Sequence, residues 1–404
     1  MIILVLNSGS SSIKYQIFNM NNRSVLTTGL LEQIGEASGR LKYKWLDGNG
    51  DTREAIAEGR VADHNEGLRL ILDITLKLGV IHTLNELSGI GHRVVHGGET
   101  FWKPALIVDK VVDAIRDMVP LAPLHNPANL MGIEVSRHLC PNVPQVAVFD
   151  TAFHQTMPPH AYHYALPYTF YKELRVRRYG FHGTSHRYVA KQCAAYLGKA
   201  LSECNLITLH LGNGGSATAI KGGESVDTSM GMTPLEGLVM GTRCGDLDPA
   251  IPFYLARNLG KSFDEIENIF NTQSGLKGIC GANDMREVER LAAGGNLNAR
   301  LAIDMFCYRI RKYIGEFYAV IGSVDAIIFT GGIGENAVEI REQCCSGLEA
   351  MGIIMDPAKN SAPLLSLREV STAGARVKVM VIPTNEELEI AQQTVECIKS
   401  AEGK

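Results

Sequence analysis

Long apolar runs are missing from this sequence, and no uninterrupted stretch approaches the roughly 20 residues that a membrane-spanning helix needs. The apolar start of the chain, Met1–Leu6, has no basic region and is too short for the core of a secretory signal. The chain also lacks an excess of basic residues, since its formal net charge is -4. We therefore expect no membrane span and no nucleic-acid partner.

Paired cysteines are also missing. The nine cysteines are an odd number without CxxC spacing, and Cys344 and Cys345 are adjacent. This pattern argues against both a disulfide framework and a zinc site. Reduced thiols and a cytoplasmic location are the expectation.

Length and strand–helix alternation indicate the fold class. At 404 residues the chain is too long for one hydrophobic core, so two domains are expected, with a boundary near Asp150. Strand patterns that alternate with helical patterns predict an α/β protein. The expected strands are Ile2–Leu6, Ile13–Met20, Gln145–Phe149, Leu206–Leu211, Ala217–Lys221 and Ala326–Thr330. The expected helices are Glu66–Leu78, Ser185–Leu197, Phe263–Phe270, Leu297–Ile321, Glu386–Lys399 and a segment from Ala337 to about Met351, and 356–374 is expected to be a loop.

Two strand–turn–strand units have small-residue turns, at 7–12 and 212–216. Turns without bulky side chains can surround phosphate oxygens with backbone N–H groups. From composition alone, a flexible surface turn is the favoured interpretation of either turn. Their recurrence suggests a weak internal duplication and makes phosphate binding as plausible as a surface turn, because a nucleotide held between two domains needs a cradle from each.

The glycine-rich segment after the strand Ala326–Thr330 has two interpretations. Gly332-x-Gly334-x-x-Ala337 matches a dinucleotide-binding fingerprint, with Asp356 at the distance of the ribose-binding acid. That fingerprint normally opens a domain, and too little chain follows here for a nicotinamide-binding sheet. Glycines that let adenosine approach a strand–helix turn explain the same residues.

Two histidine pairs suggest zinc ligands, because His92 and His96 are spaced i, i+4, as are His182 and His186. The residues between the first pair favour a strand, where such side chains lie far apart, and no third ligand is evident. Zinc therefore stays a minor hypothesis.

Arginines and acids supply the remaining chemistry. Arg93 and Arg243 lie beside glycines and can present a planar fork to a carboxylate or phosphate, although salt bridges are the commoner use. Asp150, after a strand, suits a magnesium or substrate contact, but it could equally cap a turn. Glu386 and Glu387 could simply favour a helix dipole. The residues alone point to a two-domain α/β phosphotransferase of unknown substrate.

These segments together resemble the acetate kinase family over essentially the whole chain. The resemblance is carried by residues 7–14, 91–99, 120–127, 149–154, 178–186, 227–237, 329–336 and 383–387. Departures are conservative, such as Ala282-Asn283 where Ser-Ser is common and Cys244 in place of a frequent Ser.

The resemblance implies an α/β fold of two related actin-like (ribonuclease H-like) ATPase domains with an active-site cleft between them. The first would span 1–150 and be joined by the C-terminal helix 386–404, and the second would span 151–385. It further implies a homodimer that transfers the ATP γ-phosphoryl to acetate reversibly, giving acetyl phosphate and ADP, with Mg²⁺ or Mn²⁺ as the metal.

The family's functional residues map onto matching positions. Arg93, Arg243, His182 and Asp150 would be catalytic, with His182 a hydrogen-bond donor. Asn7 and Glu386 would hold the metal. The resemblance places the nucleotide at Lys14, His210, Leu211, Gly212, Asn213, Gly214, Asp284, Met285, Arg286, Gly332, Ile333, Gly334, Glu335 and Asn336.

The acceptor pocket would comprise Arg93, Val95, Leu124, Phe181 and Pro234. Val95 favours acetate, because propionate-preferring relatives tend to have a smaller residue there, and propionate kinase is the alternative. A nucleotide-dependent binding protein without catalysis and a nicotinamide oxidoreductase are the rival hypotheses from other classes.

Overall fold

The computed structural model describes residues 1–123, 125–363 and 366–403. The chain forms two compact units, one made of Met1–Ala152 and Asn385–Lys404, the other of Phe153–Thr384. None of the helices in the described part of the chain combines the length and apolar character that crossing a bilayer requires.

The first unit is built on an eight-stranded sheet with the order β5-β4-β3-β2-β1-β6-β8-β7. Strands β1 to β5 pair antiparallel, whereas β1, β6 and β8 run parallel to one another. The strands are β1 Ile2–Ser8, β2 Ile13–Asn19, β3 Ser24–Glu32, β4 Gly39–Leu46, β5 Thr52–Gly59, β6 Leu87–Val94, β7 Ala105–Leu106 and β8 Gln145–Phe149.

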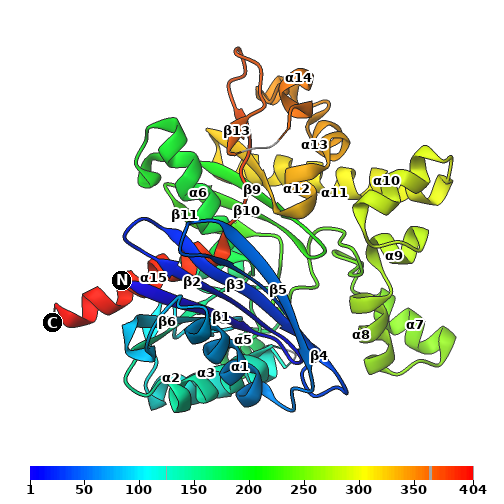
Figure 1. Cartoon of the computed structure of the whole chain (residues 1–404). Coiled ribbons are helices and arrows are strands. Elements are labelled where there is room, and N and C mark those ends of the chain that lie inside the picture. Colours follow the sequence, from blue (N-terminus) through cyan, green and yellow to red (C-terminus); the bar gives the residue numbers. More distant parts are fainter. Residues whose placement is uncertain (124, 364–365, 404) are drawn as a thin grey trace. The chain divides into compact units, whose positions relative to one another are not determined.

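Helices cover both faces of this sheet because its central strands are apolar on both sides. Leu4 and Leu6 of β1 belong to the core under α1, whereas Ile3 and Val5 belong to the core under α15. Figure 1 shows α15, in red, along the first strands, in blue. The helices are α1 His64–Lys77, α2 Asp109–Asp117, α3 Asn126–Leu139 and α15 Glu386–Glu402, with short 3₁₀ turns at Leu84–Glu86 and Val119–Leu121.

Glycine on β6 lets α15 lie close to the sheet. A Cβ atom at Gly91 would lie 2.3 Å from Thr394 Oγ1 and 2.9 Å from an Ile390 methyl carbon. Side chains of any size at this position would push the helix away. This close approach brings the start of α15, with Glu386, to the end of β6 that carries Arg93.

The second unit has a six-stranded sheet with the order β11-β10-β9-β12-β14-β13. Alternate residues of β9 again serve two cores: Ile207 packs with α11 and Leu206 packs with α6. The strands are β9 Leu206–Leu211, β10 Gly215–Lys221, β11 Glu224–Thr228, β12 Ala326–Thr330, β13 Arg368–Glu369 and β14 Lys378–Val381.

The helices of the second unit are α4 Pro159–Tyr162, α5 Tyr168–Leu174, α6 Gly183–Leu197, α7 Ile251–Leu259, α8 Phe263–Thr272, α9 Gly275–Cys280, α10 Met285–Ala293, α11 Leu297–Ile321, α12 Gly331–Asn336, α13 Val338–Cys345 and α14 Pro357–Ser361. Short 3₁₀ turns lie at Ala152–Thr156, Leu201–Glu203 and Glu349–Met351.

The two sheets repeat one topology. In the first, β3-β2-β1 are antiparallel and continue into parallel β6 and β8. In the second, β11-β10-β9 are antiparallel and continue into parallel β12 and β14. The duplication suggested by the two strand–turn–strand units, and the α/β class, are therefore confirmed.

Two local predictions were wrong. Gly331–Asn336 is the short helix α12 rather than a turn, because the Glu335 carboxylate accepts the Gly331 N–H at 3.0 Å and Arg341 binds the carbonyls of Gly334 and Glu335. Tertiary contacts thus stabilise a helix that its glycines disfavour.

The expected loop at 356–374 contains α14 and the short strand β13. Asp356 caps α14 by accepting the N–H of Ala358 at 3.0 Å, and Pro357 occupies the first helical position. This Asp–Pro start signal was present in the sequence.

Candidate active site

In the first unit, polar residues gather where parallel strands end. Leu6 of β1 lies opposite His92 of β6, and Arg93 lies opposite Val148 of β8, so Asn7, Arg93 and Asp150 lie at the same edge of the sheet. The turn after β1 is closed by a 2.8 Å hydrogen bond from the Gly9 N–H to the Ser12 carbonyl.

Arg93 and Asp150 form an ion pair with 3.0 Å between Nη2 and Oδ2. The Asp150 side chain is only 1% exposed, whereas Arg93 retains 21%. Burial alone would lower the pKa of Arg93, but the carboxylates of Asp150 and Glu386 outweigh it and raise the pKa. Because the printed bond to Asp150 uses only one of the five guanidinium donors, Arg93 keeps donors for a second anion.

The first turn of α15 adds two acids to this edge. Glu386 Oε2 lies 4.0 Å from Arg93 Nε, and Glu387 forms an ion pair with Lys14 of β2. Burial raises the pKa of Glu386 to about 7, and the charges of Asp150 and Glu387 add to this effect.

The charge balance at this edge fits a cation. Asp150, Glu386 and Glu387 face only two cations here, Arg93 and Lys14, so the acids are in surplus when Glu386 is ionised. The raised pKa of Glu386 means that its ionised form needs a further positive charge nearby. Amide and carboxylate oxygens, as on Asn7 and Glu386, suit a hard divalent ion. Among the described residues, no group of three or more His, Cys, Asp or Glu side chains could hold a metal. A metal held there would need phosphate or water oxygens as further ligands.

Val95 follows β6 and is buried. Its N–H donates to Asn129 Oδ1 at 3.0 Å, and Asn129 Nδ2 donates to the Ser8 carbonyl at 2.9 Å. Asn129 therefore ties the turn after β1 to the end of β6. Leu124, expected in the same pocket, lies outside the described residues.

In the second unit, a glycine brings two cationic candidates together. A Cβ atom at Gly214 would lie 3.5 Å from Arg243 Nη1 and 3.5 Å from His182 Nε2, so both groups face this turn. Arg243 Nη1 also donates to the Pro234 carbonyl at 3.0 Å, and burial lowers the pKa of Arg243. Phe181, which precedes His182, is buried, and its carbonyl oxygen lies 3.0 Å from His154 Nε2.

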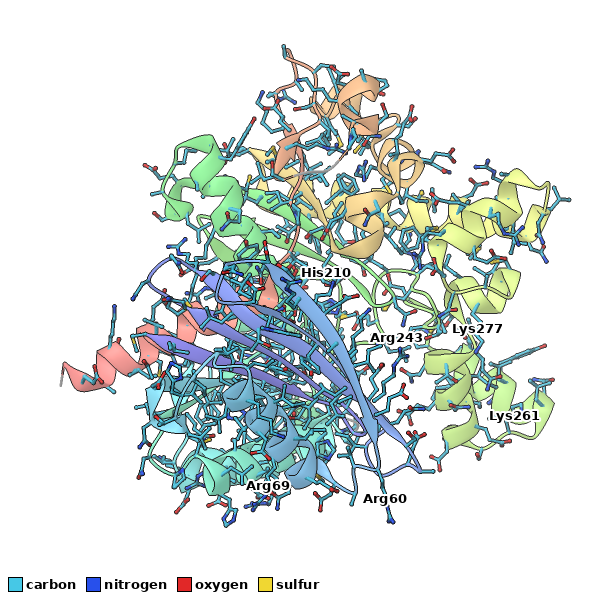
Figure 2. The ribbon with its side chains drawn as sticks, viewed as in Figure 1. Arg60, Arg69, His210, Arg243, Lys261 and Lys277 are labelled. Atoms are coloured by element: carbon cyan, nitrogen blue, oxygen red, sulfur yellow. The ribbon has the colours of Figure 1, made fainter. Side chains whose placement is uncertain are left out.

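His182 adopts a left-handed backbone conformation, with φ of 57° and ψ of 24°, at the start of α6. This conformation is uncommon for a residue other than glycine and costs about 1 kcal/mol or more. His182 Nδ1 lies 2.9 Å from Ser216 Oγ, and its ring stacks on His210 with a centroid distance of 4.3 Å. His210, on β9, and Arg243 are labelled in Figure 2.

His182, His210 and Arg243 are called the His182 cluster below. A cavity of about 700 Å³ opens beside it, within the second unit. It is large enough for a nucleotide. Eight of the predicted nucleotide residues line it: Gly212, Asn213, Asp284, Met285, Arg286, Gly332, Ile333 and Asn336.

The other predicted nucleotide residues lie elsewhere. His210 belongs to the His182 cluster, which Gly214 faces, Leu211 is buried in the sheet, and Lys14 is in the first unit. Glu335 Oε1 accepts the N–H groups of Gly331 and Thr384, at 3.0 and 3.2 Å, so it holds the start of α12. A Cβ atom at Gly334 would lie 3.3 Å from the carbonyl carbon of Phe329, which indicates a packing role.

Three cavity residues were missed: Asn283, Glu289 and Ala337. Asn283 lies beside the predicted Asp284, and its Nδ2 donates to Asn213 Oδ1 at 3.4 Å. Glu289 comes from α10, whose start at Asp284 was not predicted as a helix. A helical pattern from Asp284 would have placed Glu289 near Met285 and Arg286.

We expect Gly332→Leu to raise the KM for ATP at least tenfold while leaving the KM for the acceptor nearly unchanged. A Cβ atom at Gly332 meets nothing within 4 Å, and the residue lines the cavity, so a leucine would occupy nucleotide space. Gly315→Leu is the matched control, because Gly315 is also helical with open space around it. Equal effects of both substitutions on KM would show that the cavity does not hold the nucleotide.

The rival metal and nicotinamide hypotheses find no support in the geometry. His92 Nε2 lies 2.9 Å from Gln145 Oε1, and His186 contacts Thr208 and Ser216. Gly332 and Gly334 lie inside α12 rather than in a turn that opens a helix.

Comparisons with known proteins agree over the whole chain. The model of the acetokinase family matches residues 2–392. An acetate kinase of Syntrophobacter fumaroxidans is 55% identical over 400 residues, covering 99% of this chain and 97% of that protein. The crystal structure of Porphyromonas gingivalis acetate kinase superposes with a TM-score of 0.93 at 43% identity, covering 98% of this chain and 99% of that one. A propionate kinase from Francisella tularensis superposes with a TM-score of 0.91 at 44% identity, with the same coverages.

Proposed function

This chain belongs to the acetokinase family, and we infer that it is an acetate kinase. It transfers the γ-phosphoryl of ATP to the carboxylate of acetate, giving acetyl phosphate and ADP. Its two sheets are those of the two actin-like ATPase domains of this fold.

The turn from Gly212 to Gly214 carries the mechanistic argument. Gly212 and Asn213 line the nucleotide-sized cavity, and the next residue, Gly214, faces both Arg243 and His182. A nucleotide in this cavity can therefore direct its phosphates toward two hydrogen-bond donors. Phosphoryl transfer requires this kind of positioning and charge neutralisation, and little covalent chemistry from the protein.

In the reaction, an acetate oxygen attacks the γ-phosphorus while the bond to the bridging oxygen of ADP breaks, and ADP keeps that electron pair. Acetate is already ionised at neutral pH, so no general base is needed.

We assign Arg243 and His182 to the transferring phosphoryl and Arg93, oriented by Asp150, to the acceptor carboxylate. Val95, Phe181 and Pro234 are proposed to contact the acetate methyl.

Acetate kinases use a divalent metal together with ATP. We propose Mg²⁺, for which Mn²⁺ can substitute, held through Asn7 and Glu386, because the surplus negative charge at that edge fits a cation. Bound metal would supply positive charge to the phosphate oxygens. Homodimer formation and a cytoplasmic location stay predictions.

The choice of acceptor is testable with a hydroxylamine trap for acyl phosphate, using ATP, Mg²⁺ and either acetate, propionate or butyrate. We expect the highest kcat/KM with acetate. Since one methylene in an apolar pocket discriminates by roughly 10–200-fold, propionate should react more slowly rather than not at all. Val95→Ala should shift the preference toward propionate.

Higher activity of the wild type with propionate would instead identify a propionate kinase of the same family. No acyl phosphate with any of the three acids, from a protein that binds ATP, would favour a nucleotide-dependent binding protein.

A further inference from the structure

A row of hydrogen-bonding side chains lies beneath His182. Thr208 Oγ1 is 2.7 Å from His186 Nδ1, and His186 Nε2 is 2.8 Å from Ser216 Oγ. Ser216 Oγ in turn is 2.9 Å from His182 Nδ1. The row thus leads from the buried sheet to the ring whose Nε2 faces Gly214.

His186 can bond in this row in only two ways. It is fully buried, and burial, together with the nearby rings of His154, His210 and His182, lowers its pKa well below the usual value. A neutral imidazole has one N–H donor and one acceptor nitrogen. If His186 accepts from Thr208, it donates to Ser216, and Ser216 can then either donate to His182 Nδ1 or accept from it, because a hydroxyl oxygen can accept two hydrogen bonds. If His186 donates to Thr208 instead, Ser216 donates its single proton to His186 and must accept from His182 Nδ1.

The direction of the hydrogen bond between Ser216 and His182 determines the state of His182. If Thr208 donates to His186, His186 donates to Ser216, and Ser216 donates to His182 Nδ1, then His182 is neutral and carries its proton on Nε2. If Nδ1 instead donates to Ser216, it carries a proton, and Nε2 can donate only when His182 is a cation.

The surroundings disfavour that cation. Arg243, on the Gly214 side, carries a positive charge near His182, and the rings of His186 and His210 on the other side supply no negative charge. His182 also lies at the start of the 15-residue helix α6, where the helix dipole is positive. A positive charge on His182 would therefore be repelled by Arg243 and by the helix dipole, and none of these contacts offers a negative group to offset it.

We propose that Ser216 and His186 are positioning residues that hold His182 as the neutral tautomer with its proton on Nε2, aimed at the transferring phosphoryl. The catalytic part of this inference rests on the proposed function. His182 then donates a hydrogen bond throughout the transfer without giving up a proton, and Thr208 polarises the row from its buried end.

The tautomer can be measured without turnover. In protein labelled with ¹⁵N-histidine at pH 7.5, with the His182 signals assigned by their loss in His182→Asn, we expect an unprotonated Nδ1 and a protonated Nε2. Ser216→Ala should move these signals toward a mixture of tautomers. Ser371→Ala is the matched control, because Ser371 is equally buried in the second unit and its hydroxyl donates to Glu369 Oε1 at 2.7 Å, outside this row.

Kinetics give an independent readout. We expect Ser216→Ala to lower kcat roughly tenfold, less than the 10²–10³ for loss of a whole donor, with KM values for ATP and acetate within about twofold of wild type. Ser371→Ala should leave kcat unchanged. His182 with a protonated Nδ1 in the wild type, or an unchanged kcat in Ser216→Ala, would overturn the proposal. A wild type with the expected tautomer but no acyl phosphate would instead overturn the proposed function.

Discussion

Replacing Arg243 with alanine should lower kcat for acetyl phosphate formation by roughly 10²–10³, equivalent to about 3–4 kcal/mol of transition-state stabilisation. Arg243 Nη1 lies beside Gly214 and is held there by the Pro234 carbonyl at 3.0 Å. Its charge is therefore in place before the reaction begins, and burial makes that charge more effective than it would be in water. The KM for ATP should change much less than kcat.

Two variants sharpen this test. Arg243→Lys keeps the charge but loses the planar fork, so it should recover only part of the lost rate. Arg300→Ala removes an exposed arginine of the same unit and should leave kcat unchanged. A kcat within threefold of wild type in Arg243→Ala, with the fold intact by circular dichroism, would remove Arg243 from the catalytic assignment.

Asp150→Asn should lower kcat by roughly 10²-fold, although the substitution preserves shape. Asp150 is buried and binds Arg93 at 3.0 Å, so it fixes the direction of the guanidinium. Without this carboxylate, Glu386, 4.0 Å from Arg93 Nε, and the more weakly interacting Glu387 remain as acids near Arg93, and we expect them to draw the guanidinium away from the acceptor. Steady-state kinetics with acetate as the varied substrate would measure the loss.

A double-mutant cycle separates orientation from direct chemistry. If Asp150 acts only through Arg93, then Asp150→Asn combined with Arg93→Ala should be no slower than Arg93→Ala alone. A multiplicative loss would show that Asp150 also contacts a reacting group. Asp325→Asn is the control, because Asp325 pairs with Lys199 at 2.6 Å on the second unit, in a contact that we assign no part in catalysis.

The regular parts of the fold were predictable because their signals are local. The apolar runs at Gln145–Phe149 and Leu206–Leu211 coincide with β8 and β9, and the periodic segment Leu297–Ile321 coincides with α11. The glycine-rich α12 was not predictable, because its stability comes from Arg341, which the fold brings to its carbonyl end.

The sequence by itself determined the α/β class, the repeated strand–turn–strand units and, through motifs that match over the whole chain, the family. Periodicity and motif order are properties of neighbouring residues, so one sequence suffices to reveal them. The assignment of individual residues to the active site stays a prediction that the experiments above address.

Only the tertiary structure decided which of these residues meet. Asn283 and Glu289 line the cavity, whereas the Glu335 carboxylate accepts a hydrogen bond from the Gly331 N–H at the start of α12. The row beneath His182 draws on β9, β10 and α6, and its members are up to 34 residues apart in the chain. Hydrogen-bond direction and burial depend on contacts between such distant segments, and a linear pattern contains no record of those contacts.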